Sequence, residues 1–282
     1  MHLYLAVIFS SMGKRGDSCP VKRRLDETSL IFLALNAGAA TAPSGAELGP
    51  AISAYNRRDF ESVVELAEPL ARKGDKNAQY LTCSAYNNWK PLTTEHIVKG
   101  TAWCEAAAAQ GKIEANYNLF LRYSIAGLNG KRRPAEGFKH LVIAARAGLP
   151  AAQTYLADQY ALGVAGVTPA DLTAAAQWAR AASEAGAPRA QIQLGAHLFK
   201  GLGVSKDLVE AYKWIKLASI HPLSSTGAQD PLRMHPAWTP NDAAQTAASL
   251  SMVAASMTPG QREKAEALVS AFKPKESPNY PR

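Results

Sequence analysis

Two cysteines are the first residues of this chain whose type and spacing suggest chemistry. Cys83 and Cys104 lie about 20 residues apart, and a third cysteine, Cys19, falls in an N-terminal leader. In an oxidising compartment Cys83 and Cys104 could form a disulfide, and closing a loop of about 20 residues stabilises a fold by roughly 3 kcal/mol. The alternative is two separate buried thiols that act as small apolar side chains. Two cysteines do not satisfy a zinc ion, so we expect no metal site.

Histidines and carboxylates are scattered along the chain and match no catalytic motif. No histidine pair has the spacing of a zinc-binding helix, and there is no nucleophile elbow, P-loop or dinucleotide fingerprint. The polar groups left for an enzyme are Asp158, Glu136 and His197, which lie on different repeats of the sequence. We therefore expect no catalytic residues and no cofactor. The alternative to a non-catalytic protein is a periplasmic hydrolase or a glycan-binding accessory protein acting on cell-wall material.

Tryptophans could form a platform on which sugars or bases stack. Trp103, Trp178 and Trp214 recur in phase with a repeat, which favours core packing over ligand stacking. Trp89 and Trp238 are out of phase, so they are better candidates for an exposed contact.

The repeat itself is marked by the signature Gly-x-x-x-Ala. Its glycines are Gly74, Gly111, Gly148 and Gly186, at steps of 37, 37 and 38 residues. A fixed period of this size is typical of a solenoid of stacked structural units. Each glycine suits the position just after a helix end, where a left-handed backbone is required, and each alanine begins the next helix.

Overlaying the repeats predicts two helices in each, joined by a glycine-rich turn. Large residues four and eight positions after each alanine form a helical packing stripe. Cys83 takes the small position that Gly195 holds in the last repeat, and Cys104 takes the place of Ile215. Both cysteines are thus expected to face the contact between the two helices of one hairpin.

The combined pattern A-x-x-x-L-G-x-x-Y-x-x-G-x-G-V, followed by A-x-x-W-x-x-x-A-A-x-x-G, resembles the Sel1-like repeat (SLR) family, a relative of the TPR solenoids. The match is closest over residues 190–218 and weakest over 78–111. The resemblance implies an all-α fold, a right-handed superhelix of helical hairpins. It also implies a non-catalytic scaffold that binds a protein or peptide.

In TPR-like arrays the first helices of successive repeats line the concave side, so the resemblance also implies a partner-binding groove. Residues two, six and nine positions beyond each starting alanine are expected to point into it. From these positions come the predicted groove residues Tyr80, Ser84, Asn87, Tyr117, Ser124, Thr154, Asp158 and Ile192. The alternative for any one of them is packing between neighbouring first helices.

Residues 1–46 do not belong to the array. A basic flank at 22–24, an apolar run at 30–35 and small residues up to Ala46 describe a secretory signal. The apolar run is too short to cross a membrane. We expect a periplasmic or secreted protein without stable membrane insertion after cleavage, or a cytoplasmic one if the leader is not a signal.

Composition agrees with a helical protein that can bury a sizeable core. The chain has 282 residues, 47% of them hydrophobic, and a net charge of +8 that is spread along its length. The triplet at 131–133 is its one basic cluster in the repeats and suits a solvated turn, so we expect no nucleic-acid partner. Around four repeats at 75–222, the sequence predicts an N-terminal hairpin (47–74), an irregular connector (223–240), capping helices (241–272) and a mobile tail (273–282).

Overall fold

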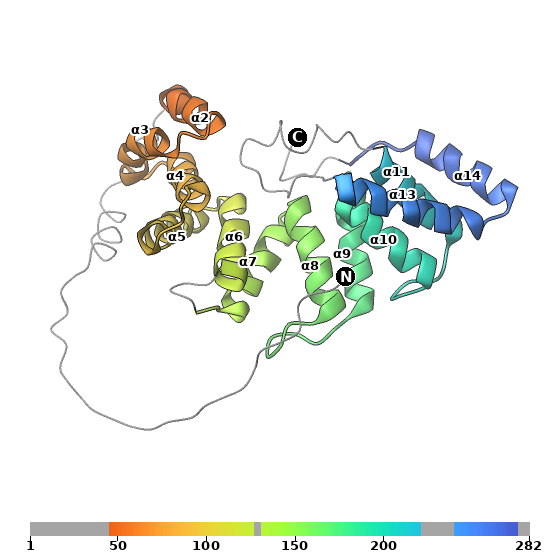
Figure 1. Ribbon diagram of the computed structural model, residues 1–282. Coiled ribbons are helices and arrows are strands. Elements are labelled where there is room, and N and C mark those ends of the chain that lie inside the picture. The colour runs from red at the N-terminus through yellow and green to blue at the C-terminus, as the bar shows by residue number, and fades with distance from the viewer. Residues whose placement is uncertain (1–44, 127–130, 221–239, 276–282) are drawn as a thin grey trace, which may run out of the picture.

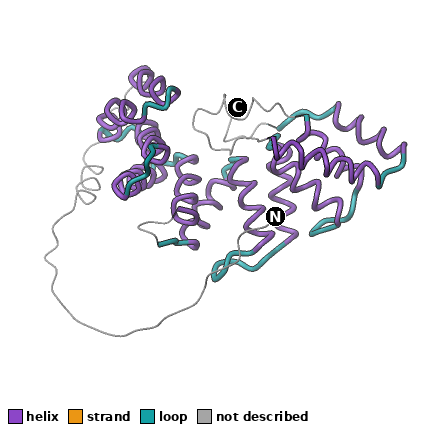
Figure 2. The backbone as a smooth tube through the Cα atoms, viewed as in Figure 1, coloured by secondary structure: helices purple, strands orange, loops and turns teal. Residues whose placement is uncertain are grey.

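A computed structural model of the chain describes residues 45–126, 131–220 and 240–275. Over these residues the structure is helical without any strand, apart from one isolated bridge between Val164 and Thr168. Helical hairpins follow one another in series, so the chain is an all-α solenoid as predicted (Figure 1 and Figure 2). Nearly all of the predicted leader and connector, most of the tail, Cys19 and Trp238 lie outside the described residues.

Each predicted repeat contains a first and a second helix. The first helices are α4 (Lys76–Asn88), α6 (Ile113–Phe120), α8 (Pro150–Leu162) and α10 (Pro188–Lys200). The second helices are α5 (Thr94–Ala109), α7 (Pro134–Arg146), α9 (Leu172–Glu184) and α11 (Leu208–Ser219). A second helix packs against the first helix of its own hairpin, and α5, α7 and α9 also contact the first helix of the next hairpin. Each hairpin is therefore covered by its neighbours.

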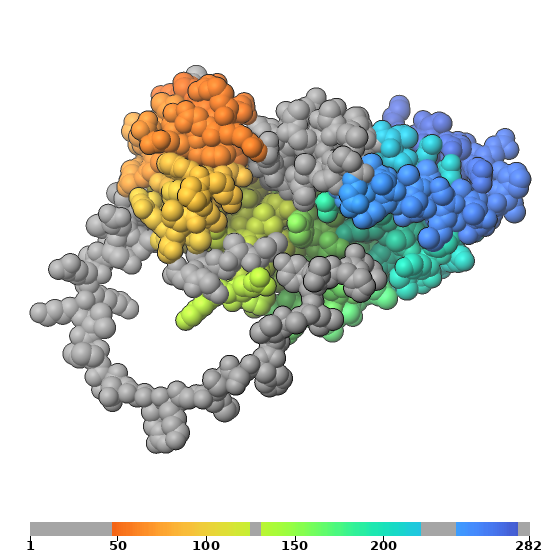
Figure 3. Space-filling view, viewed as in Figure 1, coloured from red at the N-terminus to blue at the C-terminus, as the bar shows by residue number. Residues whose placement is uncertain are grey.

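Further helices cover the two ends of the array. The N-terminal end has a short 3-10 helix, η1 (Gly45–Leu48), and the pair α2 (Gly49–Asn56) and α3 (Phe60–Arg72), of which α3 packs on α4. At the other end α13 (Pro240–Ala255) and α14 (Pro259–Ser270) pack on α11. The space-filling view shows these two groups at opposite ends of the molecule (Figure 3). End helices of this kind shield apolar faces that a terminal repeat would otherwise expose.

Helix starts and ends carry recognisable local signals. The carboxylates of Asp59, Asp75, Asp171 and Asp207 each accept a hydrogen bond from a backbone N–H in the first turn of the helix that follows. Thr258 and Gln261 form a capping box at the start of α14. The four repeat glycines have φ between 80° and 94°, the left-handed region that a glycine adopts without steric cost.

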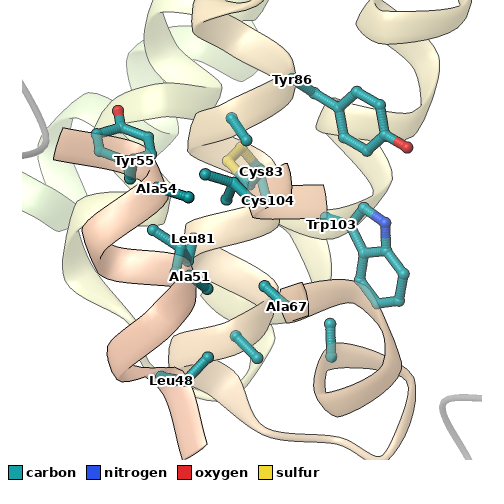
Figure 4. Packing of buried hydrophobic residues seen from close by; sticks show 14 of the residues in the cluster. Leu48, Ala51, Ala54, Tyr55, Ala67, Leu81, Cys83, Tyr86, Trp103 and Cys104 are labelled. Carbon is teal, nitrogen blue, oxygen red and sulfur yellow. A yellow bond between two sulfur atoms is a disulfide. The ribbon is translucent and has the colours of Figure 1, made fainter. Parts of the chain in front are cut away.

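Close contact between the helices of a hairpin depends on small residues. In the last repeat Gly195 of α10 faces Ile215 of α11, and a side chain at this position would collide with Ile215 and approach the Ala211 carbonyl oxygen to 3.2 Å. In the first repeat Cys83 and Cys104 occupy the same two positions. They are surrounded by buried side chains from α2 to α5, including Ala51, Leu81 and Trp103 (Figure 4).

The structure differs from the prediction in three places. The first helix of the second repeat does not stay α-helical, because α6 continues as a π-helical turn, η2 (Leu121–Ala126). Phe120 stands just before η2, at the position where the other repeats have a small residue. The sequence also predicts that Asn241 or Asp242 is the N-cap of the helix after the connector, but α13 begins at Pro240, so both residues lie in its first turn. Leu66, which has the repeat position of Trp103 and Trp178, is 45% exposed.

Candidate interaction surface

The first helices of successive repeats contact one another through side chains 34 to 38 positions apart in the sequence. We call these contacts the α4–α6 seam (Ser84, Asn87, Asn118 and Arg122), the α6–α8 seam (Tyr117, Phe120 and Tyr155) and the α8–α10 seam (Asp158 and Gln193). The first-helix face is the set of partly buried residues on and beside these seams. Its members are Asn87, Asn118, Tyr155, Asp158, Ile192 and Gln193.

The α4–α6 seam is polar. The side-chain amide of Asn118 donates to the Ser84 hydroxyl at 3.4 Å and to the Cys83 sulfur at 3.6 Å. Arg122, in η2, donates to the amide oxygen of Asn87. The Asn87 amide nitrogen donates in turn to the sulfur atoms of Cys83 and Cys104, at 3.6 and 3.7 Å. A continuous polar chain therefore runs from η2 to the two cysteines.

The α6–α8 seam is aromatic. The ring centroid of Tyr155 lies 5.9 Å from the ring centroid of Tyr117 and 5.5 Å from that of Phe120. These distances are typical of favourable aromatic pairs. Tyr117 and Phe120 are 1% and 2% exposed, whereas Tyr155 is partly exposed. The first-helix face thus carries an aromatic edge between two polar seams.

The α8–α10 seam is formed by a carboxylate and an amide. Gln193 donates to Asp158 Oδ1 at 2.5 Å. Burial raises the pKa of the Asp158 carboxyl above its ordinary value of 3.8, and the Gln193 hydrogen bond, Arg189 and His197 oppose that rise. The His197 ring is held separately, because its Nδ1 lies 2.7 Å from the backbone oxygen of Leu202.

The structure places the predicted groove residues at two depths. Tyr80, Ser84, Tyr117 and Thr154 are 1–7% exposed and lie in helix–helix contacts. The Tyr80 ring lies under the Lys112 ammonium, 5.3 Å from the ring centroid, and the Thr154 hydroxyl donates to the Pro150 carbonyl oxygen. Asn87, Ser124, Asp158 and Ile192 are partly exposed. Of these four, Ser124 packs against Gly137 of α7, so its side chain is already in a helix–helix contact.

The two cysteines are brought together as a disulfide between α4 and α5. Their Cα atoms lie 5.1 Å apart, within the ordinary range for this bond, and both residues are at most 1% exposed. The bond lies directly beneath the α4–α6 seam, because Asn87 and Asn118 both contact its sulfur atoms.

The remaining residues that could do chemistry are held apart. Glu136 pairs with Arg133 at the start of α7, away from the α8–α10 seam that contains Asp158. Nδ1 of His140 lies 2.9 Å from Asn116, and its ring stacks on Tyr123; burial lowers its pKa. Among the described residues no three His, Cys, Asp or Glu side chains form a group that could hold a metal ion.

The in-phase tryptophans pack in the core, and the out-of-phase Trp89 is partly buried as well. Trp103 and Trp214 are 1% and 2% exposed, and Trp178 is partly buried. Trp89 lies in the α4–α5 turn and stacks on His96 with ring centroids 4.7 Å apart. Trp89 is therefore part of an aromatic stack at the rim of its hairpin.

Comparison with known proteins identifies the repeats. The family described as Sel1 repeat matches residues 113–149, 150–186 and 188–220. The chain contains three Sel1 repeats. These three Sel1 repeats coincide with the hairpins α6–α7, α8–α9 and α10–α11. The hairpin α4–α5 lies outside the matched ranges and is the one that contains the disulfide.

Two solved structures share the fold. One is c5321, a protective antigen present in uropathogenic Escherichia coli strains displaying an SLR fold, with a TM-score of 0.60 and 23% identity; the match covers 90% of this chain and 50% of that one. The other is a Sel1 repeat protein from Oxalobacter formigenes, with a TM-score of 0.54 and 26% identity, covering 69% and 56%. The chain thus spans only about half the length of these relatives. No curated protein matches it significantly.

Two features of the hairpins were not predicted from the sequence. One is Arg122, which belongs to the unpredicted η2. The other is a glutamine that directly follows the repeat alanine and donates to a carbonyl oxygen near the end of the preceding second helix. These bonds join Gln79 to Ala71, Gln153 to Ala145 and Gln191 to Ser183. The recurrence of glutamine after alanine was a visible signal for them.

Within the described residues, no helix is long and apolar enough to span a membrane.

Proposed function

We propose that this Sel1 repeat protein is a non-catalytic scaffold that binds a protein or peptide through its first-helix face. The observation that carries the proposal is the composition of that face, where the polar α4–α6 and α8–α10 seams flank the aromatic edge of Tyr155. Such a face suits an extended peptide or a polar partner surface, because tyrosine supplies contact area at low entropic cost and amides supply hydrogen bonds.

The proposed location is the bacterial cell envelope. The Cys83–Cys104 disulfide supports it, since disulfides persist in oxidising compartments and are rare in the cytosol. The basic and apolar pattern of residues 22–46 supports it as well. N-terminal sequencing of protein from fractionated cells tests both: a periplasmic form lacking these residues is expected, and an intact cytoplasmic form would contradict the location.

Copurification with the full chain tests the binding role. Asn118→Arg and Gln193→Arg each place a long charged side chain on the first-helix face, and Gln177→Arg does the same on the exposed surface of α9. We expect the first two variants to lose a partner that the wild type and the Gln177 variant retain. Loss in the Gln177 variant alone would assign binding to the second helices and contradict the proposal.

A further inference from the structure

Arg122 is a strongly buried cation without an anionic partner among the described residues. It is 5% exposed, and burial lowers its pKa. Its guanidinium donates to the neutral amide oxygen of Asn87. The ion pairs of the described residues involve other bases, and none includes Arg122. Burying an uncompensated charge is costly, so residues of this kind are normally paired.

The other strongly buried charge among the described residues is compensated. Asp75 is 7% exposed and accepts a short hydrogen bond, 2.6 Å, from the Ala78 N–H at the positive end of α4. The partly buried Glu210 contacts Arg180, Lys213 and the Trp214 indole. Arg122 has no comparable compensation among the described residues.

Arg122 is itself buried, but it lies beside residues that reach the surface. It lies on the α4–α6 seam, whose other members Asn87 and Asn118 are partly exposed, so the seam reaches the surface of the first-helix face. It is carried by η2, and π-helical turns inside helices are frequently found at functional sites. The neighbouring groups are neutral amides and a hydroxyl, which can bind an anion without competing for it as a carboxylate would.

We infer that the α4–α6 seam is an anion-binding subsite in which Arg122 takes a carboxylate group of the bound peptide. The inference rests on the proposed function and names one chemical feature of the partner. A carboxylate suits the site because its single charge and two oxygens match one guanidinium fork. A phosphate dianion would need a second positive charge beside Arg122. Arg133, which lies over the Tyr123 ring, does not supply it, because it is already paired with Glu136.

The test uses the full chain and a fluorescein-labelled peptide of five glutamates flanked by alanines, read by fluorescence anisotropy at fixed ionic strength. Arg122→Gln is expected to weaken affinity at least tenfold, and Arg122→Lys, which keeps the charge but loses the fork, at least threefold. Arg146→Gln, an exposed arginine on α7, is the matched control and should bind as the wild type does. Glutamine in place of glutamate in the peptide should abolish binding, and inorganic phosphate should compete only weakly.

Thermal unfolding provides a second reading of the same variants. A cation held for a ligand at the expense of stability predicts that Arg122→Gln unfolds at the same or a higher temperature than the wild type. Equal peptide affinity in all variants, strong competition by phosphate, or a lower unfolding temperature for Arg122→Gln with unchanged affinity would overturn the inference. Partner copurification that persists in Arg122→Gln but is lost in Gln193→Arg would refute the subsite alone, leaving the first-helix face as the binding surface.

Discussion

Cys83 and Cys104 occupy in the first repeat the same pair of positions that Gly195 and Ile215 occupy in the last. In the last repeat the absence of a side chain on Gly195 makes room for Ile215, whereas in the first a disulfide bridges the two helices with Cα atoms 5.1 Å apart. One helix–helix contact is thus filled in two chemically different ways. The bond stands in the hairpin whose sequence matches the repeat pattern least well.

Removing the disulfide should weaken the N-terminal part of the array. Replacing both Cys83 and Cys104 with Ala is expected to lower the free energy of unfolding by about 3 kcal/mol, because the loop closed by the bond gains entropy on unfolding. Urea unfolding followed by the intrinsic tryptophan fluorescence, to which the buried Trp103 contributes, measures the change. A reductant should destabilise the wild type similarly and leave the double variant unaffected; a wild type indifferent to reductant would contradict a structural bond.

Filling the space at Gly195 should destabilise the last repeat. Gly195→Val introduces atoms where Ile215 already lies, and overpacking of this kind costs about 1–3 kcal/mol. Ile215→Ala removes the obstructing side chain, so the double variant should recover part of the loss. A double-mutant cycle measured by chemical denaturation checks this, and strictly additive effects would show that the two residues do not share one contact.

The glutamine after the repeat alanine should couple neighbouring hairpins. Gln153→Ala removes the buried hydrogen bond to the Ala145 carbonyl oxygen, which is expected to cost about 1–2 kcal/mol. Gln177→Ala, on the exposed surface of α9, is the control and should change stability little. Hydrogen exchange of α7 and α8 provides the local reading. Unchanged protection there in Gln153→Ala would mean that the bond contributes nothing to the stacking.

Asp158 should make stability depend on pH. Because burial raises the pKa of this carboxyl in the folded state, the folded chain binds the proton more tightly than the unfolded chain. Its contribution is fully present below the ordinary value of 3.8 and is lost as pH rises through the raised pKa. Asp158→Asn keeps an acceptor for Gln193, so it should be more stable than the wild type at pH 7 and equally stable near pH 3. Parallel stability curves for the two proteins would contradict this assignment.

The repeat phase was sufficient to predict the solenoid and many of its helix boundaries. Helix caps such as Asp171 and Asp207 and the glycine turns are local signals, so they can be read from sequence. The burial of the predicted groove residues was harder to predict, because Tyr80 and Tyr117 lie on helices whose flanks are covered by neighbouring first helices. That closeness depends on how tightly successive hairpins stack, which periodicity does not encode.

The π-helical turn and Arg122 could not be predicted for a related reason. Phe120 stands where the other repeats have Cys83, Ala157 or Gly195, and the first helix of that repeat leaves regular α geometry directly after it. The repeat pattern assigns Arg122 to a position shared with Ala85, Gln159 and His197, which gives no hint of a buried guanidinium. Its burial and its single amide partner become visible only with the hairpins in place.

Site-specific photo-crosslinking in the native cell compares the two helix layers directly. A photoreactive phenylalanine analogue is placed singly at Asn118 or Gln193 on the first-helix face, and at Lys139 or Gln177, two exposed positions on the second helices, for comparison. We predict one common cross-linked partner from the first-helix positions and none from the second-helix positions. A partner captured only from Lys139 and Gln177 would contradict binding through the first helices.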